Sequence, residues 1–404
     1  MVNKSQHNEH GFVSLFTVVF FALLATVITI GFLRIMTLEQ KQAIDNDLTA
    51  RAFSAAEAGI EDGKRAILAY AQLAESDPNK AAFRTALNSN ACDALFGATS
   101  PIATAIGLKP DGEISPSNQQ NLYYRCLNVH LNTADYIGSL DTDKSQIIPL
   151  KGEGSFNSVN FSWHLNSMTQ TNDGDGLTPN LSSSAWPTSS KYLPPVGEFT
   201  QDGQSPPAYM RLQLFGVPKS GNFDRNTLDQ RSFTAFLTPL SSSASGAKPL
   251  PTNVTMQAGD PRGFNQLKSS PYAVQCMEAE AAEDNIGNYA CKAALGLPSG
   301  ALDTNNNNYY LRITPIYRRT HFRVELQSGG SIVNFNEVQP IIDSTGSAAA
   351  DVYRRIVART TFPGQAFAIS RFGFEIADSV CKDFFITDNT ANFVDNSSEC
   401  SDNP

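Results

Sequence analysis

The chain has 404 residues and a net charge of −9, and only 17% of its residues are charged. This acidic balance argues against a general nucleic-acid-binding surface, which needs clustered lysines and arginines. The length suffices for one large domain or two modest ones. Serine, threonine, asparagine and glycine are abundant, which is typical of an exported, loop-rich β domain.

Residues 12–33 carry no charge and are mostly apolar. At about 1.5 Å per residue they form roughly 33 Å of helix, enough to cross a bilayer core of about 30 Å. A secretory signal has a shorter apolar core followed by small residues at its cleavage site, and this stretch has neither feature. The sequence therefore predicts a transmembrane helix, preceded by a polar stretch, residues 1–11, that ends in Gly11.

The helical pattern continues beyond the apolar segment, without a proline, up to residue 76. Small and apolar residues recur three, four or seven positions apart, which places them on one face of a helix. These residues are Ile44, Leu48, Ala52, Ala55, Gly59, Ala66, Tyr70 and Leu73. We predict one helix over residues 12–76, transmembrane at 12–33 and amphipathic at 34–76.

Residues 77–120 are predicted to hold a short helix at 79–96 and then a connector broken by prolines and glycines. From residue 121 the apolar period changes to two, which predicts half-buried antiparallel strands. We expect a hairpin link at 318–320 and one β-rich head over residues 121–404, so the fold class is α+β. The alternating residues expected in the core are Leu127, Val129, Leu131, Val159, Phe161, Trp163, Leu165, Met210, Leu212, Leu214, Leu311, Ile313, Phe322, Val324 and Leu326.

All six cysteines follow the apolar segment. None forms a Cys-x-x-Cys motif, which argues against zinc and thioredoxin-like sites. Their even number indicates disulfides in an oxidising compartment, and buried free thiols are the alternative. Many pairings are open, and our hypothesis is pairing between sequence neighbours: Cys92–Cys126, Cys276–Cys291 and Cys381–Cys400.

The N-terminal arrangement resembles the type IV pilin-like family: a short polar leader ending in Gly11, then Phe12, then an apolar helix that becomes amphipathic. The stretch Ser-Ala-Ala-Glu-Ala-Gly at residues 54–59 is similar to the AAEA signature of the PilX-type minor pilins. The resemblance implies that a prepilin peptidase cuts after Gly11. Phe12 would then be the mature N-terminus, which is commonly methylated in the family. The stretch from Cys381 to Cys400 resembles the disulfide-bounded C-terminal loop of pilins.

The resemblance also implies a pilin-like fold with most of the chain outside the cytoplasmic membrane, assembled into a surface fibre. Its partners would be other pilin subunits and the inner-membrane assembly platform, with a surface ligand that the sequence leaves open. In such a fibre the helices of neighbouring subunits pack together. Ala52, Ala55, Ala56 and Gly59 are small enough for close helix approach, and we interpret them as the helix-packing residues.

One position departs from the major pilins. They carry glutamate at the fifth mature position, where this chain has Phe16. A carboxylate inside a bilayer is costly unless it is paired, and in the family it pairs with the N-terminal ammonium of a neighbouring subunit. A chain that lacks it gives up this contact, which suggests a minor subunit, at the tip or initiating the fibre. Many PilX-type sequences lack this glutamate wherever they sit, so placement in the shaft stays open.

Motifs of catalysis are not found in the sequence. Asp343-Ser344-Thr345-Gly346 has glycine one residue too late for an aspartic protease motif, and a turn before a strand is the simpler interpretation. His130 and His164 are expected on the polar faces of strands as structural residues, as is His321. Asp173 and Asp175 lie among clustered oxygen donors that could hold Ca²⁺, but the spacing of an EF-hand is missing, so a solvated turn is the alternative.

We therefore predict a minor pilin that is not an enzyme. A membrane-anchored extracellular adhesin that does not polymerise is the alternative, and an anchored hydrolase has no motif to support it.

Overall fold

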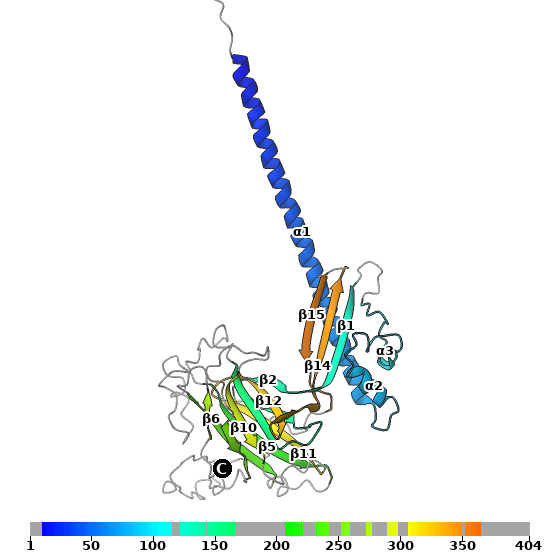
Figure 1. Ribbon diagram of the computed structural model, residues 1–404, viewed down its shortest axis with the longest axis vertical. Helices are drawn as coiled ribbons and strands as arrows, with labels where there is room; N and C mark the ends of the chain where they lie inside the picture. Colours follow the sequence, from blue (N-terminus) through cyan, green and yellow to red (C-terminus); the bar gives the residue numbers. More distant parts are fainter. Residues whose placement is uncertain are drawn as a thin grey trace, which may run out of the picture. The chain divides into compact units, whose positions relative to one another are not determined.

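The computed structural model describes residues 10–114, 122–142, 144–165, 207–220, 231–241, 252–258, 272–276, 289–297, 306–349 and 352–364. It has a long N-terminal helix followed by a β-rich region, which confirms the α+β class (Figure 1). The helices are α1 (His10–Gln72), α2 (Lys80–Leu87) and α3 (Pro101–Ile106).

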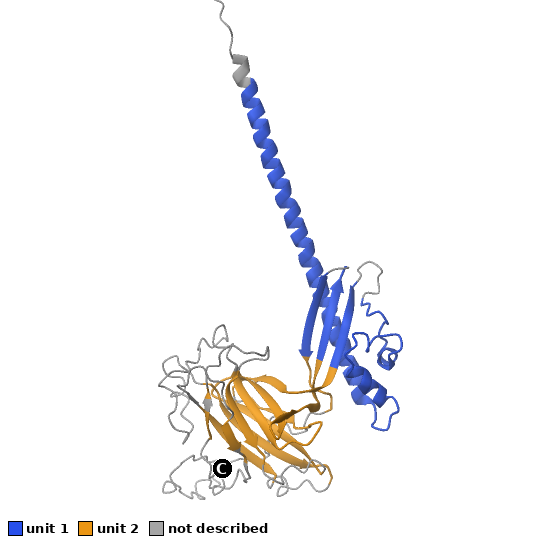
Figure 2. Cartoon of the chain, in the orientation of Figure 1, with its two compact units in different colours: residues 1–129, 342–358 blue, residues 130–341, 359–404 orange. Residues whose placement is uncertain are grey.

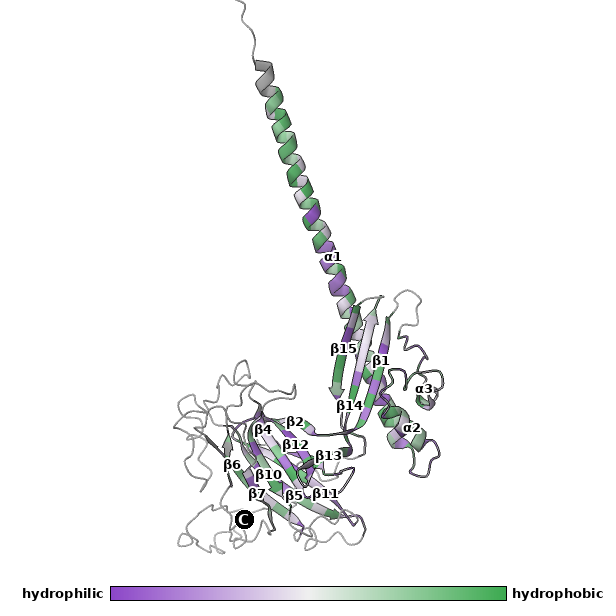
Figure 3. Cartoon of the chain, in the orientation of Figure 1, coloured by the Kyte–Doolittle hydropathy of each residue, from purple (hydrophilic) through white to green (hydrophobic). Residues whose placement is uncertain are grey.

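The helix α1 is continuous, as predicted, and ends four residues before the predicted boundary at 76. It is mostly apolar on every side up to Leu33, and polar and apolar residues alternate beyond it (Figure 3). Within the described residues it is the one helix that is long and apolar enough to cross a membrane. The helix therefore has two regions with different surfaces, one apolar on every side and one amphipathic.

Contacts between Cα atoms divide the chain into two compact units (Figure 2). Unit 1 comprises residues 1–129 and 342–358, and unit 2 comprises residues 130–341 and 359–404. Unit 2 is thus inserted into unit 1, between two strands that are neighbours in one sheet. This division differs from the single head expected over residues 121–404, because the first and last two strands belong largely with α1.

A three-stranded sheet of order β1-β14-β15 accompanies α1 in unit 1. Its strands are β1 (Leu122–Thr133), β14 (Phe335–Ala348) and β15 (Val352–Arg359). The amides of Thr360 and Phe362 donate to the carbonyls of Pro340 and Val338, so the chain after β15 continues antiparallel to β14. One boundary between the units falls within each of the three strands.

The helix α1 lies very close to β14. A Cβ atom at Gly346 would overlap the Ala52 carbonyl oxygen and the Ala56 amide nitrogen. A Cβ atom at Gly59 would overlap the Ser344 hydroxyl, so both elements use glycine at the contact. Small residues on both sides allow this approach, and the burial of Ala52 and Ala56 is complete.

Unit 2 contains a twelve-stranded sheet in which most neighbouring strands are antiparallel. Two pairs, β6 with β9 and β10 with β7, are parallel, so the sheet is mixed and not purely antiparallel as expected. The strands are β2 (Tyr136–Leu140), β3 (Gln146–Pro149), β4 (Ser158–Leu165), β5 (Tyr209–Pro218), β6 (Ser232–Ser241), β7 (Thr252–Thr255), β8 (Gln257–Ala258), β9 (Tyr272–Cys276), β10 (Tyr289–Gly296), β11 (Asn307–Ile316), β12 (Thr320–Ser328) and β13 (Ser331–Val333).

The predicted alternation is confirmed in both units. Every residue expected in the core is buried, except Leu165, whose side chain lies outside the described residues. Those from β4, β5, β11 and β12 belong to one hydrophobic cluster of unit 2, in which the Phe161 and Trp163 rings stack at 5.5 Å between centroids. The Trp163 indole N–H donates to the Ala208 carbonyl at 2.8 Å, so its polar atom is also satisfied.

Three local predictions differ from the structure. The hairpin at 318–320 does not form, because β11 pairs with β5 and β3 while β12 pairs with β4, β2 and β13.

The connector after residue 97 contains α3, which begins at Pro101. Proline suits the first position of a helix, and the Ser100 hydroxyl accepts from the Ala103 amide to cap it. The predicted helix at 79–96 is shorter, limited to α2, with Phe83 and Leu87 buried.

The contact between α1 and β14 predicts a local effect of Gly346→Ala. The added methyl group must displace the α1 backbone, at a cost of about 1–3 kcal/mol, which is typical of overpacking. We expect amide hydrogen exchange to accelerate in residues 52–60, measured by mass spectrometry on the full-length chain in detergent. Gly154→Ala is the control, because the nearest atom to its added Cβ lies 3.9 Å away. Unchanged exchange in Gly346→Ala would contradict the close contact.

Candidate functional site

The N-terminal half of α1 presents an extended apolar surface. Every large apolar side chain described between residues 15 and 38 is exposed, with fractions from 46% to 69%. A surface of this size is unfavourable in water and marks a contact with lipid or with other proteins. The threonine hydroxyls in this stretch donate to carbonyls one turn earlier, Thr29 to Ala25 at 2.8 Å and Thr26 to Ala22. The segment therefore has its polar side-chain groups satisfied internally, as a lipid environment requires.

The mature N-terminus that the sequence predicts, at Phe12, lies at the start of this apolar surface. Gly11 and Phe12 belong to the first turns of α1, and the Phe12 side chain lies outside the described part of the chain. Phe16, at the position that carries glutamate in major pilins, is 69% exposed. In this structure its ring is part of the continuous apolar surface.

The predicted helix-packing residues lie in the other half of α1. Ala52, Ala55 and Ala56 are at most 1% exposed, and Gly59 lies against Ser344 and Tyr124. Their close contact is with a strand of the same chain, which corrects the interpretation of these residues as a helix–helix contact with other subunits. The largest exposed apolar surface of α1 that other helices could cover lies in its N-terminal half.

Two further contacts hold the neighbouring elements of unit 1 to α1. The Arg65 guanidinium donates to the Ile106 carbonyl at the end of α3 at 2.7 Å, and it also donates to Asp62 within α1 at 2.8 Å. The Tyr124 hydroxyl of β1 forms a hydrogen bond with the Asp62 side chain. Burial, followed by the nearby Asp62 charge, raises the pKa of Tyr124 above its ordinary range. The Tyr124 ring meets the Phe96 ring edge-on at 5.1 Å.

The predicted disulfides are confirmed wherever the structure describes the cysteines. Cys92 is bonded to Cys126, which ties the loop after α2 to β1. Cys276 is bonded to Cys291, which joins β9 to β10 within unit 2. Cys381 and Cys400 lie outside the described residues, as do Asp173 and Asp175 of the candidate Ca²⁺ site.

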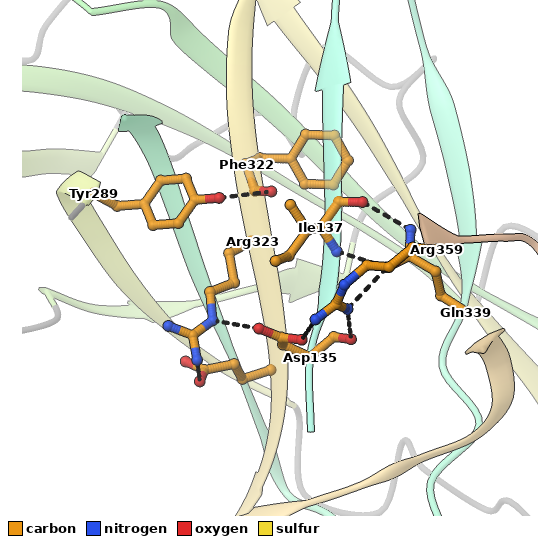
Figure 4. Close-up of polar contacts among 8 residues, drawn as sticks. Asp135, Ile137, Tyr289, Phe322, Arg323, Gln339 and Arg359 are labelled. Carbon is orange, nitrogen blue, oxygen red and sulfur yellow. Dashed lines mark hydrogen bonds and ion pairs between the residues drawn. The ribbon is translucent and has the colours of Figure 1, made fainter. Parts of the chain in front are cut away.

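The polar centre of unit 2 is Asp135, which sequence reasoning missed (Figure 4). This residue follows β1 and is only 3% exposed. One carboxylate oxygen lies 2.9 Å from Nε of Arg323, and the other accepts from Nη2 of Arg359 at 2.7 Å. Arg359 also donates to the Asp135 carbonyl at 3.0 Å and to Oε1 of Gln339 at 3.2 Å. We call Asp135, Arg323 and Arg359, with Gln339, the Asp135 centre.

The Asp135 centre joins segments far apart in the sequence. The Gln339 side-chain amide donates to the Ile137 carbonyl at 2.8 Å and accepts from the Ile137 amide at 3.0 Å, and so links β14 to β2. Arg323 also forms an ion pair with Glu325 at 2.7 Å, so two arginines face two carboxylates. With balanced charge and small exposure, the arrangement is that of a structural network. No local motif marks Asp135, because its partners come from three distant strands.

The three histidines expected on the polar faces of strands differ in their burial. His130 and His321 are partly exposed on β1 and β12, as predicted, whereas His164 is buried at the end of β4. Its Nε2 atom has no hydrogen-bond partner, and its backbone is left-handed, with φ of 61°. Burial, followed by repulsion from Arg318, lowers the pKa of His164 to about 3. Its expected place on a polar strand face is therefore wrong, since the ring is buried and neutral.

A cavity of about 560 Å³ opens on unit 2, between residues 149–156 and the first residues of β11. No cluster of three metal-ligating side chains occurs in the part of the chain that the structure describes. The three notable regions are thus the exposed half of α1, the Asp135 centre and this cavity.

Replacing Asp135 with asparagine tests the polar centre. Asp135→Asn leaves two partly buried guanidinium groups with reduced compensation, and breaking such a network costs about 3 kcal/mol. We expect a lower urea midpoint for the full-length chain in detergent, followed by tryptophan fluorescence. Asp141→Asn is the matched control, because its ion pair with Lys144 lies at the surface. Equal midpoints for both variants would show that the Asp135 centre stabilises nothing.

The burial of His164 predicts that the free energy of unfolding decreases at acidic pH. Its pKa is about 3 in the folded chain and near its ordinary value of about 6.5 when unfolded. Between these values the unfolded chain binds more protons, so the free energy of unfolding falls as the pH falls, by up to about 1.4 kcal/mol per pH unit.

We expect the urea midpoint of His164→Gln to depend less on pH between 6.5 and 4 than that of the wild type. Carboxylates titrate in the same window in every variant, so the comparison between variants isolates the histidine. His321→Gln, on the partly exposed face of β12, is the control and should keep the wild-type dependence. A slope for His164→Gln as steep as that of the wild type contradicts the prediction.

Comparisons with protein-family models, with curated proteins and with solved structures find no match to this chain. The functional interpretation therefore rests on the geometry above.

Proposed function

We propose that the chain is a minor subunit of a type IV pilus or a related pilin-like fibre, which assembles through the exposed half of α1. The observation that carries this proposal is the division of α1 into two halves. From residue 52 onward, one face of α1 is buried against the chain's own sheet, whereas residues 15–33 are mostly apolar on every side and exposed. One continuous helix can thus be anchored in its own unit and still offer a complete apolar surface to other molecules.

The exposed half suits two environments in succession. In a bilayer, lipid covers the apolar side chains, and the segment is long enough to span the hydrocarbon core. In a fibre, the corresponding halves of neighbouring helices would cover the same side chains. Transfer between these environments exchanges one apolar contact for another, so the step depends on packing and on the assembly platform more than on the hydrophobic effect.

The rest of the chain is consistent with a place outside the cytoplasmic membrane. Both described disulfides are of the kind that persists in an oxidising compartment. Unit 2, inserted between β1 and β14, would be the part presented on the fibre surface, without catalytic function. Phe16 leaves the apolar surface of α1 without the carboxylate of major pilins, which favours a minor subunit, at the tip or initiating the fibre, over the repeating one.

The direct test is the mature N-terminus. In cells that contain prepilin peptidase, we expect N-terminal sequencing of the purified protein to start at Phe12, and the protein to co-purify with sheared fibres. The variant Gly11→Val should keep its leader and be absent from the fibres. Ser14→Ala, three residues beyond the cleavage site, is the control and should be processed normally.

The contrary outcome identifies the alternative function. A protein that keeps Met1 in the presence of the peptidase, and is found in the membrane but never in fibres, would be an anchored extracellular adhesin or binding protein that does not polymerise.

A further inference from the structure

Two arginines lie on one face of the strand pair β5–β11 in unit 2. Arg211 is directly opposite Thr314, and Gln213 is directly opposite Arg312. Residues that are opposite each other in an antiparallel pair share a face of the sheet, so these four side chains lie on the same face. Leu212, which lies between Arg211 and Gln213 along β5, belongs to the hydrophobic cluster. The arginines are therefore on the face that is turned away from the core.

The two guanidinium groups are neighbours without an anionic partner. Arg211 and Arg312 are diagonal neighbours in the register, and such positions are about 7–8 Å apart. Burial, followed by repulsion from Arg312, lowers the pKa of Arg211. In the part of the chain that the structure describes, neither arginine forms an ion pair. Two like charges are thus held close together there without compensation.

Three buried polar atoms at this place have no hydrogen-bond partner. They are Nε of Arg211, Nε of Arg312 and Oε1 of Gln213. Most buried side-chain polar atoms in folded proteins have a partner, so each exception needs an explanation. An anion between the arginines would accept from both guanidinium groups, and a hydroxyl group of the same ligand would donate to Gln213. A ligand of this kind accounts for the unpaired atoms and for the uncompensated charge together.

Aromatic rings border the two arginines. Arg211 lies over the ring of Phe236, its neighbour on β6, with 5.9 Å between the guanidinium carbon and the ring centroid. The next side chains on the same face, Phe215 on β5 and Tyr310 on β11, stack at 5.8 Å between centroids. All of these side chains are partly buried. Attraction for an anion is therefore weakened less by water than it would be at a fully exposed surface.

We propose that Arg211 and Arg312 together bind one oxyanion group of a small ligand: a carboxylate, a sulfate or a phosphate. The planar guanidinium group donates two hydrogen bonds to oxygens in this arrangement. Neighbouring positions on the same face carry no charge, as at Thr234 and Thr314, and the whole chain has a net charge of −9. The site therefore suits a single anionic group and not a polyanion such as a nucleic acid. It lies within unit 2, so binding does not depend on whether the chain polymerises.

The test measures how anions stabilise the full-length chain in detergent micelles. Both tryptophans of the chain, Trp163 and Trp186, lie within the residue range of unit 2, so their fluorescence during thermal unfolding reports on this unit. Sodium acetate, sulfate and phosphate are each compared with sodium chloride at equal ionic strength and neutral pH. We expect at least one of them to raise the wild-type midpoint by about 3 °C at about ten times its dissociation constant. The most effective anion identifies the group that the site prefers.

Variants separate this site from general salt effects, because sulfate and phosphate stabilise many proteins without a specific site. Arg211→Gln and Arg312→Gln should each lose most of the shift. Lys292→Gln is the matched control, since it removes one positive charge from β10, a strand of the same sheet that pairs with neither β5 nor β11. This control should respond to the anions as the wild type does.

The midpoints in chloride distinguish binding from a structural role. Arg211→Gln and Arg312→Gln remove the repulsion between like charges, so we expect neither to unfold at a lower temperature than the wild type in chloride. The proposal is overturned if both do, if no anion stabilises the wild type more than chloride, or if wild type and glutamine variants respond equally. N-terminal processing and fibre incorporation of these variants should be normal, which separates this result from the test of assembly.

Discussion

The close contact between α1 and β14 is the constraint on which the functional interpretation depends. Gly346 lies directly against the backbone at Ala52 and Ala56, which leaves no room for a side chain. This contact lies within the region, from residue 52 onward, where one face of α1 is buried. It also sets the point up to which α1 remains uncovered, and this uncovered, apolar half is the part available to lipid or to other helices.

The insertion of unit 2 between β1 and β14 places a second requirement on the chain. Three strands begin in one unit and end in the other, so the polar groups near these crossings need fixed partners. The Asp135 centre supplies them within unit 2, where the residues after β1, within β14 and at the end of β15 meet around one buried carboxylate. Removing one partner from such a network leaves a buried charge without compensation, and for this reason we expect the loss to cost more stability than breaking a surface ion pair.

Assembly through α1, as proposed, uses a part of the molecule that is separate from unit 2. It needs an apolar helix that carries no site-specific chemistry, whereas unit 2 is a mixed sheet around its own hydrophobic cluster. A chain with this division can change the surface of unit 2 without altering the helix that would join it to other subunits.

The sequence by itself determined the elements whose pattern is local: the 3.6-residue period of α1, the alternation of strands such as β4 and β12, and the two described disulfides between neighbouring cysteines. Only the tertiary structure decided which surfaces these elements cover. Small residues such as Ala52 and Gly59 predict that another element packs closely on this face of α1. Their spacing along α1 does not tell whether that element is a helix or a strand. Likewise, β11 and β12 are adjacent in sequence yet pair with different strands, and the partners of Asp135 come from segments about 190 to 225 residues away. Such contacts depend on long-range pairing, which local periodicity does not encode.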